Sequence, residues 1–228
     1  MDKKLIARFI VRALMGTPFL GVALFWPSGW QMGWWAAWAL LAVMLAWAAA
    51  TLAVILRFHP PLLAERLGPR KGAKPWDTAI MGVVGLAQVA WLVIAGFDRR
   101  YGWTSSIPCA AQIAALIVII LGYALVVWAT AANAFFSQFV RIQSERGHAV
   151  AAGGPYRTVR HPAYVGTILT ALAAPILLTS WWALIPGAIG AVAFVIRTAL
   201  EDRILQAELA GYADYARQVR YRLLPGIW

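Results

Sequence analysis

Long apolar runs separated by short polar stretches make up most of the sequence. Six runs approach or exceed the ~20 residues that a membrane-spanning helix needs, and they cover 9–26, 33–57, 77–97, 108–135, 163–179 and 181–200. The last two runs meet at Thr179, Ser180 and Trp181, so they predict a helical hairpin. The pattern therefore predicts an all-α integral membrane protein with about six transmembrane helices (five to seven).

Composition supports this interpretation and limits the domain count. The 228 residues are 62% hydrophobic and 13% charged, which is outside the range of ordinary soluble domains. The first run carries Arg8 and Arg12 at its start, as a signal peptide would, but no small-residue cleavage site follows it. We therefore expect a retained helix and one integral membrane domain.

The net charge of +11 arises from 20 basic and 9 acidic residues. A soluble protein with this balance would suggest a nucleic-acid partner, but in a membrane protein basic residues mark cytoplasmic loops. If the N-terminus is cytoplasmic, Arg99 and Arg100 are the only two of the 20 basic residues expected on the outer side of the membrane. The others, Arg70 and Lys71 among them, are expected on the cytoplasmic side. Arginine far exceeds lysine, which favours a bacterial source. We predict a bacterial inner-membrane protein that contacts lipids, binds no nucleic acid and has cytoplasmic N- and C-termini.

Three cytoplasmic segments hold most of the polar residues: 58–77, 136–162 and the tail from Glu201. Prolines in the first segment leave room only for a short helix over Leu62–Leu67. The tail predicts an amphipathic helix that lies on the membrane surface or over the bundle, because apolar residues recur at helical spacing. These are Leu205, Leu209, Tyr212, Tyr215 and Val219.

The sequence does not predict a metal site. Cys109 is the only cysteine, so it can form neither an internal disulfide nor a Cys-based metal site. His59, His148 and His161 are scattered without metal-ligand spacing.

The predicted hairpin gathers charged residues at its cytoplasmic end. Its two helices have similar lengths, so Arg160 and His161 at one end should meet Arg197, Glu201 and Asp202 at the other. Arg197 lies four residues before Glu201, on the same helix face. It is either a snorkelling arginine paired with Glu201 or an anion-binding group that faces a cavity.

The stretch GGPYRTVRHPAYVG, residues 153–166, combines a helix start with an aromatic cluster. Its Gly–Pro turn and Pro162 suit entry into a helix. Tyr156, His161 and Tyr164 additionally suit a flat heteroaromatic ligand with charged groups, such as an adenine nucleoside. The chain has no GxGxxG motif and no P-loop, so helices and loops would have to hold such a ligand.

The segment HAVAAGGPYRTVRHPAYVG, followed by RTALEDRIL and YADYARQVRYRLLPG, resembles the isoprenylcysteine carboxyl methyltransferase family. The resemblance is to the bacterial branch of these membrane methyltransferases, which also include phospholipid N-methyltransferases. It covers about 133–228, the expected cofactor-binding core. Residues 1–132, the expected N-terminal transmembrane helices, match mainly in hydropathy.

The resemblance implies an S-adenosyl-L-methionine cofactor, and it implies that Arg197 faces the substrate carboxylate. The implied cofactor-binding residues are Gln143, His148, Val150, Tyr156, His161, Pro162, Ala163, Tyr164 and Glu201. From charge alone, Arg160 or the backbone N–H groups at the Pro162 helix start could hold the cofactor carboxylate. Tyr212 and Tyr215 are expected to pack over the site.

Methyl transfer is an in-line displacement that needs proximity and alignment more than acid–base help. A carboxylate or thiolate acceptor needs no base, whereas an ammonium must first lose a proton. The sequence offers no dedicated base beyond His161 or Glu201, which is thus a catalytic candidate together with Arg197. It therefore favours a lipophilic carboxylate that Arg197 orients, such as a prenylated cysteine or an analogue. A phospholipid amine and a hydrophobic thiol remain alternatives. We expect the acceptor to enter from the bilayer and the cofactor to enter from the cytosol.

Two other classes of protein share parts of this pattern. Membrane sterol reductases, which use NADPH, contain an element like RHPxYxG, but they usually have more spans and an Asn in the place of Ala163. A non-catalytic lipid-binding or assembly protein would explain the hydropathy and the charge. It would leave the joint occurrence of RHPxY and Glu201 unexplained.

Overall fold

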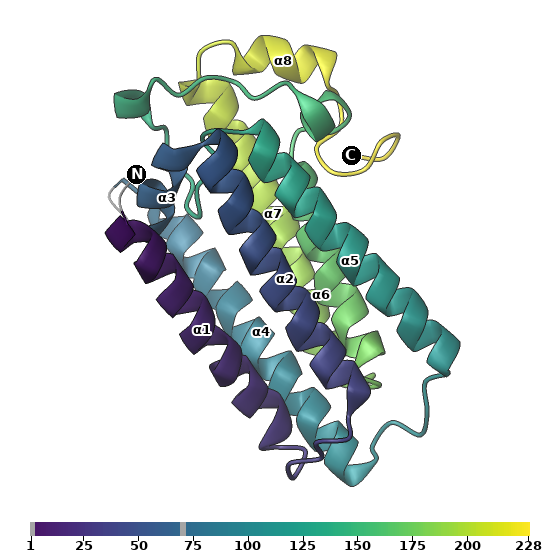
Figure 1. Ribbon diagram of the computed structural model, residues 1–228. Helices are drawn as coiled ribbons and strands as arrows, with labels where there is room; N and C mark the ends of the chain where they lie inside the picture. Colours follow the sequence, from purple (N-terminus) through teal and green to yellow (C-terminus); the bar gives the residue numbers. More distant parts are fainter. Residues whose placement is uncertain (1–2, 69–71) are drawn as a thin grey trace.

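The computed structural model describes residues 3–68 and 72–228, and these residues form helices and loops without a strand (Figure 1). Arg70 and Lys71, which we expect on the cytoplasmic side, lie outside the described residues. The helices are α1 Lys3–Phe25, α2 Trp35–Phe58, α3 Pro60–Leu67, α4 Pro75–Tyr101, α5 Cys109–Ala132, α6 Pro162–Leu177, α7 Leu184–Glu208 and α8 Tyr212–Gln218.

Five of these helices, α1, α2, α4, α5 and α7, are long and apolar enough to cross a membrane. The prediction of an all-α integral membrane protein is confirmed. The fifth apolar run, 163–179, forms α6, which has 16 residues and is shorter than a typical span. It ends early because residues 178–183 form a turn, in which the Ser180 hydroxyl accepts a hydrogen bond from the Ala183 N–H at 3.1 Å.

The tail differs from the single amphipathic helix that the sequence predicts. α7 continues through Glu201 to Glu208, and the chain then breaks at Gly211, whose φ of +79° favours glycine. α8 starts at the next residue. The break turns α8 across the end of the bundle, where Tyr212 and Tyr215 are buried.

Close packing of α5 against α6 fixes the position of α6. A Cβ atom added to Gly122 on α5 would lie 2.7 Å from the backbone oxygen of Gly166 on α6. Glycine at this crossing lets the two backbones approach, as in other membrane helix pairs. The first turns of α6, which carry Tyr164, are therefore held rigidly against α5.

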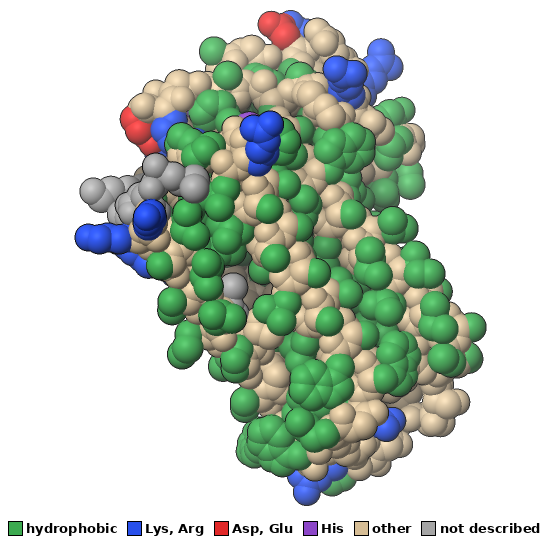
Figure 2. Space-filling view, viewed as in Figure 1, with side chains coloured by type: hydrophobic (Ala, Val, Ile, Leu, Met, Phe, Trp, Pro, Cys, Tyr) green, Lys and Arg blue, Asp and Glu red, His purple; other side chains and the backbone are tan. Residues whose placement is uncertain are grey.

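One end of the bundle carries a polar cap, which consists of α3, residues 133–161 and residues 209–228 (Figure 1). α1 begins at this end, where Leu5, Ile6 and Phe9 pack on the apolar face of α3. Figure 2 shows hydrophobic side chains along the flanks of the bundle and Lys and Arg side chains near its ends. This distribution suits a protein whose flanks face lipid.

Candidate active site

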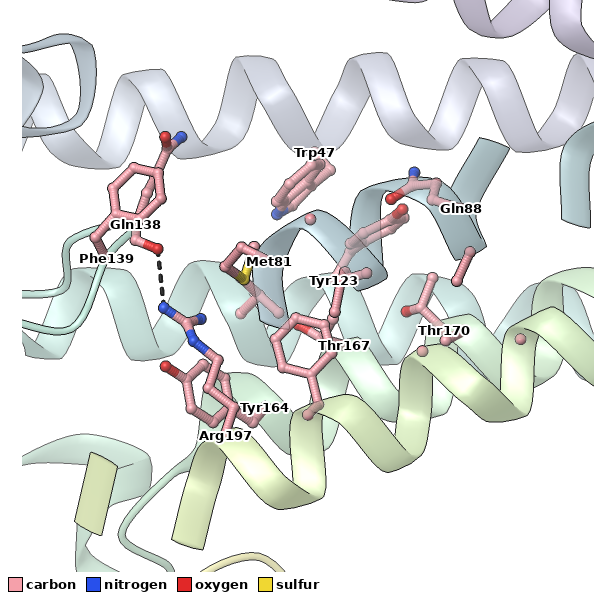
Figure 3. Close-up of a pocket in the computed structure, with 18 of the residues that line it drawn as sticks. Trp47, Met81, Gln88, Tyr123, Gln138, Phe139, Tyr164, Thr167, Thr170 and Arg197 are labelled. Atoms are coloured by element: carbon pink, nitrogen blue, oxygen red, sulfur yellow. Dashed lines mark hydrogen bonds between the residues drawn. The ribbon is translucent and has the colours of Figure 1, made fainter. Parts of the chain in front are cut away.

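Two cavities meet beneath the cap. The larger has a volume of about 530 Å³ and lies among α2, α4, α5, α6 and α7 (Figure 3). The smaller has a volume of about 60 Å³ and lies between residues 148–156, α6, α7 and α8. Tyr164 and Phe136 line both cavities, so these two side chains stand at their junction.

The smaller cavity brings together most of the residues predicted to bind a cofactor. Its lining includes His148, Val150, Tyr156, Arg160, His161, Ala163, Tyr164 and Glu201, together with Tyr212 and Tyr215 from the tail. Pro162 starts α6 next to this lining. Gln143 lies outside it, fully buried in the cap.

The start of α6 is held by the tail and by α7. The backbone N–H of His161 donates to the carbonyl of Arg222 at 2.9 Å. The His161 ring stacks on Tyr164, with ring centroids 5.6 Å apart. The Tyr164 hydroxyl donates to Glu201 Oε2 at 2.5 Å. The predicted meeting of the two hairpin ends is confirmed, and it produces an aromatic wall beside a carboxylate.

Gln143 acts on the smaller cavity through His148. Its backbone N–H donates to His148 Nδ1 at 3.2 Å, so in neutral His148 the proton must reside on Nε2. The Gln143 side chain is itself fixed by the Phe135 carbonyl at 2.7 Å. Burial, followed by the nearby Arg146 and Arg141 charges, lowers the pKa of His148. The neutral ring thus offers one N–H donor at the cavity.

The tyrosines of the smaller cavity are bound to one another and to the cap. The Tyr156 hydroxyl accepts from Asn133 Nδ2 at 3.2 Å, and the Tyr215 hydroxyl donates to the Tyr156 carbonyl at 2.7 Å. Burial raises the pKa of both Tyr156 and Tyr215. They are neutral aromatic walls, which suits an adenine ring better than a charged group.

Arg160 is engaged in a buried cluster around Asp202. It donates to the two Asp202 carboxylate oxygens at 2.8 and 3.0 Å. It also donates to the carbonyls of Val219 and Arg220 at 2.7 and 2.8 Å. Four of its five N–H groups are thereby used, so Arg160 has little donor capacity left for the cofactor carboxylate. The backbone N–H groups at the Pro162 helix start are the other group that the sequence offers for it.

Arg197 lies in the wall of the larger cavity and pairs with Asp77 instead of Glu201. Its Nε donates to Asp77 Oδ1 at 2.7 Å, and its Nη2 donates to the Gln138 carbonyl at 2.9 Å (Figure 3). Asp77 is fully buried and also accepts the Val140 N–H at 2.8 Å. These hydrogen bonds fix residues 138–140 of the cap to α4 and α7.

The remainder of the larger cavity is mainly apolar. Its polar side chains include Gln88, Tyr123, Thr167 and Thr170, and its charged lining residues are Arg66 and Arg197. Sequence reasoning missed Asp77 as the partner of Arg197 and missed Arg66 as a lining residue. Both belong to segment 58–77, whose prolines and basic residues indicated only a cytoplasmic loop.

Comparison with known proteins supports the resemblance of the C-terminal half. The model of the isoprenylcysteine carboxyl methyltransferase (ICMT) family matches residues 114–207. This segment contains the RHPxY element, Arg197 and Glu201, so the predicted resemblance is confirmed there. No curated protein matches the sequence.

One similar solved structure is that of the eukaryotic intramembrane Ras methyltransferase ICMT. It is 15% identical, with a TM-score of 0.47, over 93% of this chain and 88% of the other.

Proposed function

We propose that this chain is an S-adenosyl-L-methionine-dependent integral membrane methyltransferase that acts on a lipophilic acceptor. The observation that carries the proposal is the junction of two unlike cavities. An aromatic and polar cavity lies under the cap, and a larger apolar cavity lies among the membrane helices. Because both share Tyr164 and Phe136, a nucleoside cofactor and a lipid-like acceptor could meet at that wall.

The side chains of the smaller cavity fit this cofactor in kind. Tyr156 and the His161–Tyr164 stack offer aromatic surface to adenine, and His148 Nε2 offers a donor. Glu201 would accept from a ribose hydroxyl or from the ammonium group. The present space of about 60 Å³ is smaller than a nucleoside. We therefore expect residues 148–151, which line this cavity and are exposed or partly exposed, to move outward on binding.

When bound, the cofactor supplies an activated methyl group on a sulfonium. The chain then has to align the acceptor, exclude water and leave the nucleophile unprotonated. A carboxylate acceptor is already ionised near neutral pH, so no protein base is required. Arg197 keeps its Nε and Nη2 on Asp77 and Gln138, and Nη1 is the part of its guanidinium that could orient the acceptor.

The proposal is tested by turnover of purified protein in lipid nanodiscs. The cofactor would carry a labelled methyl group, and the acceptor would be a thioether carboxylic acid with a 15-carbon isoprenoid chain. We expect labelled methyl ester from the wild type and from His59→Ala, because His59 lies outside both cavities. We expect none from His161→Ala. NADPH-dependent reduction of a lipid without methyl transfer would instead support the reductase alternative.

A further inference from the structure

Arg66 on α3 lines the larger cavity and contacts Phe136, a residue that lines both cavities. Its guanidinium lies over the ring of Phe136, with Cζ 5.1 Å from the ring centroid. Its Nε donates to the Phe136 carbonyl at 3.1 Å, and its Nη2 lies 3.4 Å from the Thr130 hydroxyl. Phe136 is one of the two side chains that line both cavities.

Unlike the other arginines of the site, Arg66 has only neutral partners. Arg160 pairs with Asp202 and Arg197 pairs with Asp77, but no described Asp or Glu forms an ion pair with Arg66. Its neighbour Glu65 is held by Arg141 at 2.6 Å. Burial without a compensating carboxylate lowers the pKa of Arg66 to about 10. The side chain nevertheless remains positive at neutral pH.

The balance of charge in the larger cavity therefore depends on Arg66. Among the described residues that line this cavity, Arg66 and Arg197 are charged, and no Asp, Glu or Lys is present. Asp77, which does not line the cavity, neutralises the charge of Arg197. One uncompensated positive charge remains, close to the wall where the two cavities meet. A half-buried cation of this kind is stabilised by an anion that enters with the ligand.

This cavity also contains a polar group without a hydrogen-bond partner among the described residues. Trp47 of α2 stacks on Tyr123, with ring centroids 4.7 Å apart, and both line the cavity. Its buried indole Nε1 has no hydrogen-bond partner among the described residues. Figure 3 shows this ring edge directed toward the cavity. An oxygen atom of a bound ligand would satisfy this donor.

We propose that Arg66 is the specificity-determining residue for an anionic acceptor, whose carboxylate it binds beside Tyr164 while the apolar chain occupies the larger cavity. The inference rests on the proposed function and deepens it. It makes a carboxylate the preferred acceptor over a phospholipid amine, because a cationic headgroup would face Arg66 without any acidic lining residue. Arg66 also lies outside the segment that matches the family, residues 114–207.

The test compares three ligands that share one 15-carbon isoprenoid thioether chain: the carboxylic acid, its primary amide and the corresponding primary amine. Dissociation constants are measured by calorimetry on protein in nanodiscs for the wild type, Arg66→Gln and Arg66→Lys. Arg57→Gln is the matched control. Arg57 is exposed at the end of α2 that precedes α3, and it lines neither cavity. Thr130→Val removes a hydrogen-bond partner of Arg66 but leaves its charge.

We expect the wild type, Arg57→Gln and Thr130→Val to bind the acid about tenfold or more tightly than the amide, with the amine weakest. Arg66→Gln should lose this preference while binding the amide as the wild type does, and Arg66→Lys should retain part of it. An equal loss of acid and amide in Arg66→Gln would make Arg66 a purely structural brace and overturn the proposal.

A wild type that binds the amine best would overturn the proposal even if Arg66→Gln failed to fold. S-adenosylhomocysteine binding, measured on the same samples, reports on the proposed function separately. If that binding is absent while the acid preference still depends on Arg66, the methyltransferase proposal fails but the anion site stands.

Discussion

Two buried Arg–Asp pairs hold the cap to the bundle, but their surroundings differ. Asp202 accepts hydrogen bonds from Arg160, Arg222 and Tyr212, all at 3.0 Å or less, and the cluster joins α6, α7 and the tail. Asp77 accepts from Arg197 and from the Val140 N–H, and this pair borders a cavity of about 530 Å³.

The difference shows how the same chemistry can serve two purposes. A buried ion pair is favourable only where further hydrogen bonds satisfy its remaining atoms. The Asp202 cluster is saturated and lies where tail and hairpin meet, so it acts as a structural clamp. The Asp77–Arg197 pair uses Nε and Nη2 of an arginine that lines the larger cavity. We therefore propose that its Nη1 adds acceptor binding to the structural role.

Removing the clamp should have the largest effect. Asp202→Ala leaves two arginines near one another without their carboxylate, and loss of one partner of a buried pair costs about 3–5 kcal/mol. Denaturant unfolding in detergent would measure this loss of stability. The matched control is Glu208→Gln, which breaks the exposed Lys74 pair at 2.8 Å and should cost at most about 1 kcal/mol. An equal loss of stability in Asp202→Ala and Glu208→Gln would show that the Asp202 cluster is not a structural clamp.

The second pair can be separated into its structural and functional parts. Arg197→Gln should reduce methyl transfer by about 100-fold through misplacement of the acceptor, and it should leave cofactor binding unchanged. It should also destabilise the protein, because Asp77 then remains buried without its cation. Asp77→Asn combined with Arg197→Gln removes that charge, so stability should recover while turnover remains low. Recovery of both would show that Arg197 is structural only.

This second pair also marks the limit of what the sequence could predict. The hairpin lengths were enough to place Arg160 and His161 beside Asp202 and Glu201. The partner of Arg197 was not predictable, because Asp77 is 120 positions away and pairwise contacts at that range leave no local pattern. Periodicity likewise could not show where α7 breaks, since that depends on the left-handed backbone of Gly211.

Adjacent residues on α7 sharpen the contrast between clamp and site. Glu201 borders the smaller cavity, whereas Asp202 faces the clamp and is fully buried. Glu201→Gln should weaken binding of S-adenosylhomocysteine by about 1.5–3 kcal/mol if Glu201 makes a charged hydrogen bond to it. Stability should change much less than in Asp202→Ala. Calorimetry and unfolding are measured on the same samples. A larger loss of stability in Glu201→Gln than in Asp202→Ala would contradict the two assignments.

The smallest predicted effect concerns the pH response of the cap. The pKa of His148 is lowered in the folded state, so below its unfolded value of about 6.5 the unfolded chain binds more protons. The contribution of His148 to stability is therefore complete above that pH and is lost as the pH falls below it. His148→Gln should show a weaker decline in unfolding free energy on acidification. An identical decline in the wild type and in His148→Gln would contradict the lowered pKa of His148.

The central claim is that the smaller cavity binds the methyl-donor cofactor. Calorimetric binding of S-adenosylhomocysteine to the wild type, His161→Ala and His59→Ala tests it most directly, with NADPH as the competing ligand. We predict micromolar binding to the wild type and His59→Ala, and no binding to His161→Ala. Unchanged binding to His161→Ala, or binding of NADPH in place of S-adenosylhomocysteine by well-folded protein, would contradict the claim.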